Sequence, residues 1–420
     1  MTMFNNMNVA LWGFGREGQA TLKFLNQHAP QARISIIDKT NPVTLPDDVT
    51  WYDDHEGSRL IAEGFFSVII KSPGVSLYRP ELQHAIAKGS QITSGTNLWF
   101  EHYPHAKTIA ITGTKGKSTT SSLIYHALKK KDLECAFAGN IGTPLLSTLP
   151  GRDVTVMELS SYQIADLHHA PSVGMVLNLY PAHGDWHGSN DQYFQDKMRL
   201  IDLCQSHRRP VIVWKDDPVL QKKVQGLNNV YSFSDQNVLP PLPFSLDAPH
   251  LRLNVSAAIQ ACEAFGIRGP WDGTWDDFHP LPHRQERLGE KNGVLYVNDS
   301  IATIPESTIA ALEVFKDRPI YLILGGQEKM QDAENIIQKI KILKNIHVFT
   351  IPDNGERYAR LLDDIGINVT PCTNLAEAVT FAENIAIKGG VILLSPAAPS
   401  YGRFKNFEDR GDQFRKLAGF

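Results

Sequence analysis

The stretch from Gly113 to Thr119 combines the residue types that bind a triphosphate. It reads GTKGKST, directly after the apolar run TIAIT. Glycines expose backbone N–H groups to an anion, lysine balances phosphate charge, a hydroxyl reaches a divalent cation, and a following helix adds its dipole. Two residues separate Gly113 from the Gly-Lys pair, where a Walker A motif has four. Against the alternative of a glycine turn with solvated lysines, we predict a nucleoside triphosphate site at Gly113, Thr114, Lys115, Gly116, Lys117, Ser118 and Thr119.

Two further polar side chains follow strands that should adjoin this loop. Glu158 ends the apolar run VTVM, and His183 comes just after GMVLNLY. The carboxyl ends of parallel strands meet at one sheet edge, and Mg²⁺ bound with a triphosphate takes one or two protein ligands. Glu158 is therefore a metal-ligand candidate, with a carboxylate that caps the next segment as the alternative. His183 and His187 have H-x-x-x-H spacing, but the glycine-flanked HGDWHG predicts no helix, so His183 alone is the candidate and a zinc pair is not expected.

A second glycine-rich turn lies near the N-terminus. The stretch NVALWGFGREGQATLKFL predicts strand, turn and helix, and RISIID predicts a strand that ends at Asp38. Gly13, Gly15 and Gly18 form G-x-G-x-x-G, with Asp38 twenty residues after Gly18, as in Rossmann sites that bind a pyrophosphate and a ribose. A tight turn that only packs helix on strand is the alternative. The segment FSVIIKSPGVSL adds a strand with a Pro-Gly turn at its carboxyl end, which favours a nucleotide.

These sites require parallel sheets, and the rest of the chain is consistent with them. The 420 residues, 42% hydrophobic, suffice for two or three cores. Short buried strands alternate with helical segments, which predicts an α/β fold. We predict three domains: Rossmann-like over 1–94, a central P-loop ATPase-like domain with a parallel sheet over 95–281, and Rossmann-like α/β over 282–420. The segment GPWDGTWDDFHPLPHR is the predicted hinge before the last.

Composition excludes several classes of protein. A net charge of -4 gives no basic field, so nucleic acid is not an expected partner. The four cysteines are far apart without CxxC spacing, which argues against zinc clusters and disulfides and fits a reducing compartment. The N-terminus lacks a charged signal region, and no apolar run approaches the ~20 residues of a membrane span. We expect a cytoplasmic protein without membrane insertion.

Seven segments stand in an order and spacing that resembles the Mur ligases, which build the peptide stem of peptidoglycan. They are GTKGKST, GNIGTP, ELSSYQ, LPHR, VNDSIAT, LGGQEK and LSPAAPSYGRFKNFEDRG, and the resemblance covers essentially all 420 residues. The set most resembles the members that add glutamate to UDP-N-acetylmuramoyl-L-alanine. FKNFEDRG separates it from folylpolyglutamate synthase, which shares the phosphate loop. The resemblance implies an ATP-dependent ligase that forms an acyl phosphate, uses ATP and two Mg²⁺ ions, and acts as a monomer.

The resemblance also implies roles for individual residues. The UDP-sugar would contact Gly15, Arg16, Glu17, Asp38, Ser72, Asn140, Ser160 and Gln163. Besides the phosphate loop, ATP would contact Asn254, His283, Arg284 and Asp299. Glutamate would contact Thr303, Lys329, Ser400 and Phe407. Catalysis and metal binding would use Lys117, Ser118, Glu158, His183 and Lys197, the lysine as a carbamate that offers Mg²⁺ an oxygen ligand.

Without the resemblance, some of these positions have plainer interpretations. Lys197 would be an ordinary exposed helix lysine, Lys329 a solvated loop lysine, and the segment PHR a solvated linker. The family asparagine at Leu251 is missing, so adenine recognition should be looser. These alternatives stay open at the level of sequence.

Three departures from the family pattern concern the glutamate enantiomer. Enzymes that add D-glutamate usually have a lysine where this chain has Ile301, an acidic stretch where it has SGTNLWF, and EDHxDR where it has PAHGDWHG. Loss of a cation beside Thr303 removes a partner for a carboxylate, and enantiomers differ in where that carboxylate points. We favour L-glutamate, with D-glutamate as the alternative. A non-ligase P-loop ATPase or sensor, folylpolyglutamate synthesis and an NAD dehydrogenase are more remote alternatives.

Overall fold

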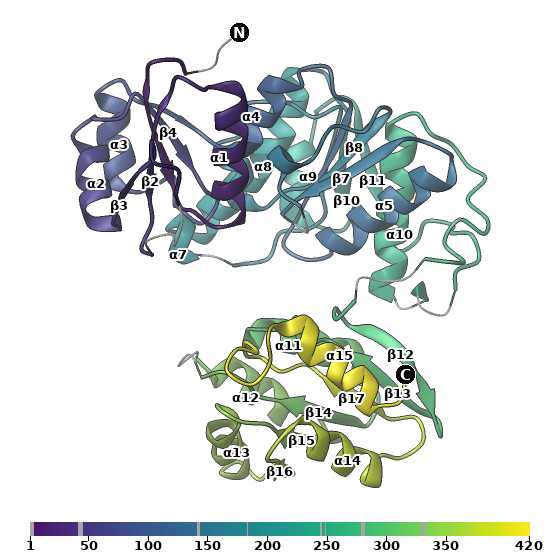
Figure 1. Ribbon diagram of the computed structural model, residues 1–420. Coiled ribbons are helices and arrows are strands. Elements are labelled where there is room, and N and C mark those ends of the chain that lie inside the picture. The colour runs from purple at the N-terminus through teal and green to yellow at the C-terminus, as the bar shows by residue number, and fades with distance from the viewer. Residues whose placement is uncertain are drawn as a thin grey trace. The chain divides into compact units, whose positions relative to one another are not determined.

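The computed structural model describes residues 4–40, 45–140, 143–182, 184–243, 246–247, 249–278, 282–328 and 332–420. By its internal contacts the chain divides into two compact units, Met1–Phe278 and His279–Phe420. The division falls inside the proline-rich segment predicted as a hinge. The first unit contains two sheets and the second unit contains one (Figure 1).

The first sheet is parallel with the order β3-β2-β1-β4-β5. Its strands are β1 (Asn8–Trp12), β2 (Arg33–Ile37), β3 (Thr50–Tyr52), β4 (Val68–Lys71) and β5 (Gln91–Thr93). Its helices are α1 (Arg16–His28), α2 (Asp54–Ala62), α3 (Pro80–Ala87) and α4 (Gly95–His102). The chain order reverses between β1 and β4, so the turns that follow these two strands lie side by side at a topological switch point.

The second sheet is parallel with the order β11-β10-β9-β6-β8-β7. Its strands are β6 (Thr108–Thr112), β7 (Cys135–Gly139), β8 (Val154–Glu158), β9 (Val173–Val176), β10 (Val211–Trp214) and β11 (Val230–Phe233). Its helices are α5 (Lys117–Lys130), η1 (Leu145–Ser147), α6 (Ser161–Ile164), α7 (Gly184–His187), α8 (Asn190–Ser206), α9 (Pro218–Val224) and α10 (Pro249–Ala264).

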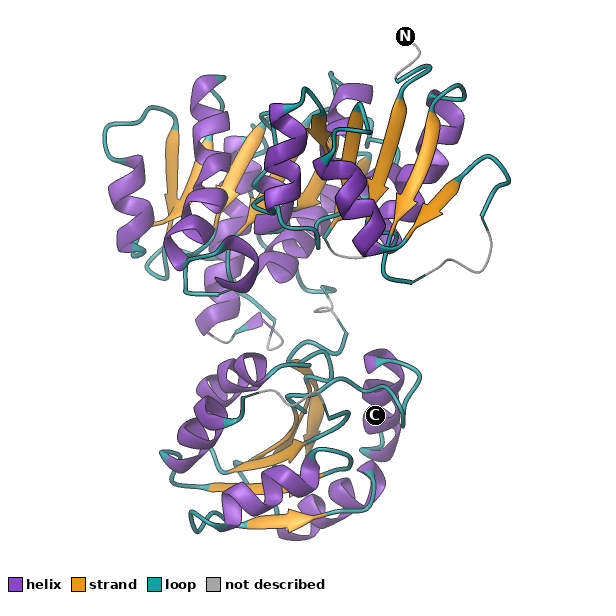
Figure 2. Cartoon of the chain, turned by 90° about the vertical axis from the view of Figure 1, so that its left-hand side faces the viewer, coloured by secondary structure: helices purple, strands orange, loops and turns teal. Residues whose placement is uncertain are grey.

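Apolar helix faces cover both sides of this second sheet. Side chains of α5 and α10 form one core with the strands, and side chains of α4, α8 and α9 form the other. The strands are buried on both faces, which explains their continuous apolar runs. In Figure 2 the strand arrowheads of the first unit lie on one side, so the loops that follow them share an edge. There β6 lies between β8 and β9, and Glu158 at the end of β8 therefore adjoins the loop after β6.

The third sheet has the order β12-β13-β17-β14-β15-β16, with β12 antiparallel to β13 and the other pairs parallel. Its strands are β12 (Glu286–Lys291), β13 (Val294–Asn298), β14 (Ile320–Leu324), β15 (Ile346–Thr350), β16 (Val369–Pro371) and β17 (Val391–Leu394). Its helices are α11 (Pro305–Phe315), α12 (Glu334–Lys341), α13 (Gly355–Asp363), α14 (Leu375–Ile385) and α15 (Phe407–Leu417).

The predicted α/β fold with three sheet domains is confirmed, and one local prediction is wrong. HGDWHG was expected to be non-helical, but Gly184–His187 form the single turn α7. Trp186 and His187 are buried and hydrogen-bonded, so tertiary contacts outweigh the flanking glycines. The domain boundaries at 94/95 and 281/282 stay predictions.

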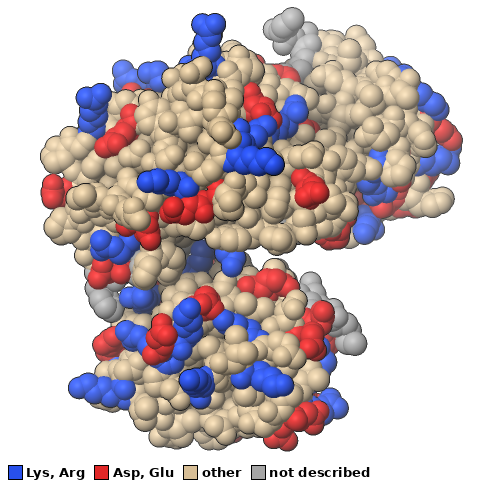
Figure 3. Space-filling model, turned by 180° about the vertical axis from the view of Figure 1, so that it is seen from behind, with Lys and Arg blue, Asp and Glu red and all other residues tan. Residues whose placement is uncertain are grey.

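Two surface properties bear on the expected partners. No helix in the described part of the chain is both long and apolar enough to cross a bilayer. On the face shown in Figure 3, basic and acidic side chains are interspersed over both units.

Candidate active site

The loop between β6 and α5 has the backbone geometry of a phosphate cradle. Gly113 and Gly116 adopt φ values of 150° and 83°, where residues with a Cβ are strained. A Cβ on Gly113 would also lie 2.8 Å from Leu177 Cβ. Lys117 Nζ donates to the carbonyls of Gly113 at 2.9 Å and Thr114 at 3.1 Å, so its side chain folds over the loop.

Residues after β9 brace this loop, and sequence reasoning did not identify them. The Asn178 side chain accepts from Lys115 N at 2.9 Å and donates to Lys115 O at 3.1 Å. Asn178 O also accepts from Thr114 N at 2.9 Å. The only sign of Asn178 in the sequence is that a polar residue follows an apolar strand, and many loops share this pattern. These hydrogen bonds hold the loop backbone in place, so that the N-terminus of α5 faces the position where a phosphate would bind.

Asn254 of α10 lies beside the loop, where an adenine-binding residue was predicted. A Cβ on Gly116 would come 2.9 Å from Asn254 Oδ1, which places this amide against the turn. Ser118 is 3% exposed in the first turn of α5. The structure therefore brings the loop and Asn254 together, and their binding roles stay predictions.

Glu158 supplies a buried carboxylate with an open coordination position. Its Oε1 accepts from Asn140 Nδ2 at 2.8 Å. Its Oε2 has no hydrogen-bond partner among the described residues, although the residue is 1% exposed. A buried carboxylate oxygen without a donor is costly unless a cation or water compensates it. This orphaned oxygen beside a phosphate cradle fits a divalent cation, which prefers oxygen ligands.

Lys197 is buried against the same edge, unlike an ordinary exposed helix lysine. Its Nζ donates to Thr112 Oγ1 at 3.3 Å, at the end of β6. Burial holds its pKa well below the usual range of a lysine, and Lys117 lowers the pKa further, while Glu158 and Asp196 oppose the shift. A lowered pKa increases the share of the neutral amine, which is the form that reacts with CO₂ to give a carbamate. His183 lies outside the described residues.

Ser118, Glu158 and Lys197 therefore fit a divalent cation if the lysine carries a carbamate. In the described ranges, no group of three or more histidine, cysteine, aspartate or glutamate residues has an arrangement that could hold a metal ion. Among these residues, a metal ion here would therefore have only one carboxylate ligand, Glu158. Its other ligands would be the Ser118 hydroxyl, the carbamate of Lys197 and the phosphates of the substrate.

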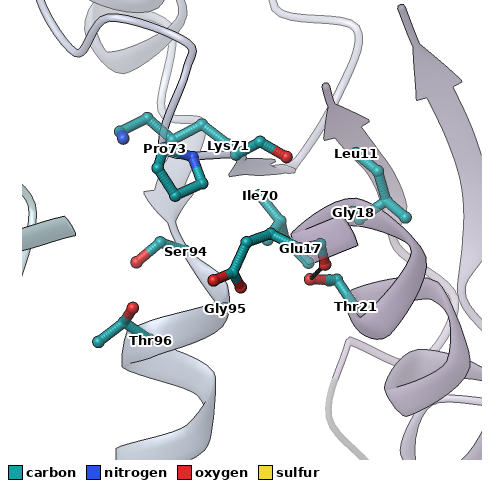
Figure 4. A pocket seen from close by; sticks show the side chains of 11 residues that line it. Leu11, Glu17, Gly18, Thr21, Ile70, Lys71, Pro73, Ser94, Gly95 and Thr96 are labelled. Atoms are coloured by element: carbon teal, nitrogen blue, oxygen red, sulfur yellow. Dashed lines mark hydrogen bonds between the residues drawn. The ribbon is translucent and has the colours of Figure 1, made fainter. Parts of the chain in front are cut away.

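The helix α1, which follows the turn after β1, lines a small cavity with the end of β4, the loop after it and the start of α4 (Figure 4). Ser72 Oγ donates to Gly13 O at 2.6 Å, which ties the loop after β4 to the turn. Asp38 Oδ2 accepts from Phe14 N at 2.6 Å. The Glu17 side chain points toward Ser94, Gly95 and Thr96. The cavity is lined by Leu11, Glu17, Gly18, Thr21, Ile70, Lys71, Ser72, Pro73, Ser94, Gly95 and Thr96.

Glu17 also connects this cavity to the second sheet. Gln163 Nε2 donates to Glu17 Oε1 at 3.4 Å. Gln163 and Ser160 form a capping box at the start of α6, so both side chains are already oriented. The structure thus brings Glu17, Ser160 and Gln163 together as predicted, while Gly15 and Arg16 lie exposed at the rim.

A buried ion pair next to the cavity was not predicted. Lys71 Nζ lies 3.4 Å from Asp166 Oδ2, with side-chain exposures of 0% and 3%. Nothing in the apolar segment VIIK indicates that the side chain of its lysine, Lys71, is buried. The pair links β4 to the segment after α6.

Glu17 should make the stability of the first unit depend on pH. Burial raises its pKa from 4.5 to about 7, so the unfolded chain releases this proton at a lower pH than the folded chain does. The contribution of Glu17 is therefore most favourable below pH 4.5 and is lost as pH rises to about 7. Glu17→Gln should gain up to about 3 kcal/mol of unfolding free energy over the wild type between pH 4.5 and 8. Urea unfolding followed by fluorescence across this range measures it, and a pH-independent difference would contradict it.

In the second unit, predicted residues meet at the carboxyl ends of β13 and β17. Asp299 accepts from Ser395 Oγ at 2.7 Å and from Gln285 N at 3.0 Å, and burial raises its pKa to about 7. His283 Nδ1 lies 3.0 Å from Asn298 Nδ2, and its ring lies edge-on to Phe407. His283, Asp299 and Phe407 therefore form one cluster, with Arg284 exposed beside it.

The residues predicted to hold glutamate are only partly grouped by the structure. Ser400 is 3% exposed in the segment after β17, and Thr303 is half-buried before α11. Lys329 lies outside the described residues. Arg410 of α15, which sequence reasoning missed, is 0% exposed and donates to the carbonyls of Ser300 at 2.8 Å, Ala398 at 2.9 Å and Pro399 at 3.4 Å. It joins the segments on which Ser400 and Thr303 lie.

Comparison with known proteins finds relatives over the whole chain. Residues 111–239 match the family described as Mur ligase middle domain, and residues 283–398 match Mur ligase, glutamate ligase domain. The chain is 34% identical to the UDP-N-acetylmuramoyl-L-alanine--L-glutamate ligase of Xanthomonas axonopodis pv. citri (strain 306), over 98% of this chain and 95% of that protein. A protein of the same name from Xylella fastidiosa (strain 9a5c) is 35% identical over 98% of this chain and 95% of that protein.

Solved structures share the fold at low sequence identity. MurF ligase from Thermotoga maritima in complex with ADP aligns with a TM-score of 0.57 and 17% identity, over 99% of this chain and 96% of that chain. UDP-N-acetylmuramate-alanine ligase MurC from Thermotoga maritima aligns with a TM-score of 0.57 and 15% identity, over 98% of this chain and 99% of that chain. The three-domain α/β architecture is therefore common to this chain and to these ligases.

Proposed function

Since this chain belongs to the Mur ligase family, we propose that it joins glutamate to UDP-N-acetylmuramoyl-L-alanine with conversion of ATP to ADP and phosphate. The observation that carries the proposal is the edge of the second sheet, where Lys117, the orphaned Glu158 carboxylate and the buried Lys197 amine converge. Relatives named for this reaction match nearly the full chain, which supports the same substrates. The reaction belongs to the synthesis of peptidoglycan precursors.

The first step transfers a phosphoryl group from ATP to the carboxylate of the UDP-sugar. The carboxylate oxygen attacks the γ-phosphorus, the bond to the β,γ-bridging oxygen breaks, and an acyl phosphate and ADP result. Two anions must approach, so the loop N–H groups and the Lys117 ammonium have to offset their repulsion and hold the phosphates in line. Asn254, His283, Arg284 and Asp299 would hold the nucleotide.

Ser118, Glu158, His183 and carbamylated Lys197 would hold Mg²⁺, which when bound neutralises phosphate charge and polarises the phosphoryl oxygens. Two ions are consistent with this set of ligands and the substrate's phosphates.

The second step forms the amide. The glutamate amine attacks the acyl carbon, a tetrahedral intermediate forms, and phosphate leaves as the nitrogen loses a proton. Thr303, Lys329, Ser400 and Phe407 would orient the amino acid. The UDP-sugar would be held by Gly15, Arg16, Glu17, Asp38, Ser72, Asn140, Ser160 and Gln163. The Glu17–Gln163 hydrogen bond, which joins residues from both sheets, supports a single substrate site there.

We propose L-glutamate as the amino acid. The relatives in both Xanthomonas and Xylella are named for L-glutamate. Ile301 supplies no charge where enzymes that add D-glutamate usually have a lysine, so the carboxylates of the amino acid must find other partners. D-glutamate is the alternative.

Phosphate release by the wild-type protein tests the proposal. We expect release only when UDP-N-acetylmuramoyl-L-alanine, ATP, Mg²⁺ and L-glutamate are all present, with an amide product detected by mass spectrometry. Turnover with D-glutamate alone would replace the L assignment. Release that does not depend on the UDP-sugar would favour a simple ATPase or sensor instead.

A further inference from the structure

Ser161, His187 and Asp196 form a buried hydrogen-bonded chain that has no role in the function described so far. His187 Nε2 lies 3.0 Å from Ser161 Oγ, and His187 Nδ1 lies 2.5 Å from Asp196 Oδ2. The His187 side chain is 0% exposed and that of Asp196 is 6% exposed. The order of the atoms matches the serine–histidine–aspartate arrangement, in which the acid fixes the ring and the ring meets the hydroxyl.

The Asp196 carboxylate sets the direction of the hydrogen bonds between Asp196, His187 and Ser161. An ionised carboxylate can only accept, so His187 Nδ1–H donates to Asp196. In the neutral ring Nε2 then has a lone pair, and the Ser161 hydroxyl donates to it. Ser161 is 3% exposed, so the arrangement serves position rather than attack on a substrate.

The other end of this chain reaches the first sheet. Tyr78, which follows β4, donates its hydroxyl to Asp196 Oδ1 at 2.5 Å. Burial and this hydrogen bond raise the pKa of Tyr78, so it stays a donor. Trp186 Nε1 donates to Pro73 O at 3.0 Å, and Ser76 Oγ donates to Trp186 O at 2.7 Å. Figure 1 shows α7 beside the first sheet, as these contacts require.

The elements involved cannot set their own relative positions. The helices α6 and α7 have four residues each, too few to be stable alone. By contrast, α8 has its own cap, since Ser189 accepts from Gln192 N, and it packs an apolar face on the sheet. It should therefore fold without the Ser161–His187–Asp196 hydrogen bonds, and Asp196 is the residue that links α8 to α6 through His187. Lys197 follows directly, and a small rotation would move its Nζ away from Thr112.

We propose that His187 is a positioning residue, which acts through Asp196 to hold α8 so that Lys197 reaches the edge formed by β6 and β8. The inference rests on the proposed function, since the position of Lys197 matters for ligase chemistry. Tyr78 extends the same control to the loop after β4. Binding of the UDP-sugar and placement of Lys197 are thereby coupled.

Steady-state kinetics give the first readout. His187→Ala should lower kcat for phosphate release about 10- to 100-fold, the usual effect of removing a residue that orients a ligand, and should leave KM for ATP unchanged. His187→Asn should recover part of the loss, because its amide can still donate to Asp196. His126→Ala is the control for loss of a partly buried histidine elsewhere in the unit, since His126 of α5 accepts or donates one hydrogen bond with Thr274 O at 3.0 Å, lies 3.3 Å from Asp277 Oδ1 and contacts the Phe278 ring. It should keep the wild-type kcat.

Chemical labelling of Lys197 gives a second readout that needs no turnover. Reductive methylation of the full-length, substrate-free protein, followed by mass spectrometry, reports access to this amine. Lys197 should be protected in the wild type and in His126→Ala, and should react about tenfold faster in His187→Ala, where α8 opens locally more often. The labelling rate of Lys197 can be interpreted even if the wild-type protein shows no ligase activity. The proposed function and the positioning role of His187 can therefore be contradicted separately.

A milder variant covers the case in which His187→Ala does not fold. Tyr78→Phe keeps the ring and removes one hydroxyl from a residue that is 37% exposed. It should raise KM for the UDP-sugar and increase Lys197 labelling to a smaller extent. Wild-type labelling of Lys197 in both Tyr78→Phe and His187→Ala would overturn the inference, as would a wild-type kcat in His187→Ala.

Discussion

Lys117→Met should lower kcat for phosphate release at least about 10³-fold. Methionine matches the length of the lysine stem but removes the charge, and removing one charged group that stabilises a transferring phosphoryl group costs about 10³–10⁵ in rate. Lys117 Nζ lies within hydrogen-bond distance of two loop carbonyls, so it already reaches over the cradle. Stopped-flow detection of phosphate, with saturating substrates, measures the effect.

Lys130→Met is the matched control for this variant. Lys130 lies on the same helix and forms an exposed ion pair with Asp277 at 2.7 Å, far along α5 from the loop. An exposed ion pair contributes at most about 1 kcal/mol to stability, so this variant should fold and retain wild-type kcat. Equal rates for the two variants would remove Lys117 from the mechanism.

Arg410→Leu should destabilise the second unit by about 3–4 kcal/mol, because it leaves several buried acceptors without a donor. Besides three carbonyls, Arg410 donates to Ser300 Oγ at 3.0 Å, and burial lowers its pKa to about 9. Leucine fills the space without replacing any of these hydrogen bonds. Guanidinium unfolding of the full chain, followed by hydrogen exchange in β13 and β17, assigns the loss to this unit.

Arg403→Leu separates this effect from the loss of any arginine charge. Arg403 is half-exposed and pairs with Asp353 at 3.1 Å, so its removal should cost less than about 1 kcal/mol. Arg410→Lys should fall between the two, since an ammonium cannot reach four acceptors spread over two segments. A loss below about 1 kcal/mol for Arg410→Leu would mean that water replaces the guanidinium.

The local pattern of apolar and polar residues was enough to predict the alternating strands and helices along the chain. Continuous apolar runs indicated strands buried on both faces, and the structure confirms the three-domain α/β fold. The GTKGKST loop was predictable because its glycines are required by backbone geometry within seven residues. Glu158 was found for the same kind of reason, as an acid at the end of a buried strand.

Long-range contacts set the limits of sequence reasoning. Asn178, Lys71 and Arg410 hold loops through residues more than ten positions away, and no spacing along the chain records such a contact. His187 was assigned to an irregular segment because glycines flank it, yet its hydrogen bonds to Ser161 and Asp196 stabilise a helical turn. The binding roles of the site residues rest on resemblance and stay predictions.

Gly113 illustrates how tightly one position can be restricted in evolution. Two independent barriers oppose any other residue there, the backbone conformation and the side chain of Leu177. Shortening Leu177 to alanine would keep the Cβ that a methyl group on residue 113 would meet, and it would leave the backbone strain untouched. No single compensating change can therefore open a neutral path away from glycine, and this site should remain fixed while its neighbours drift.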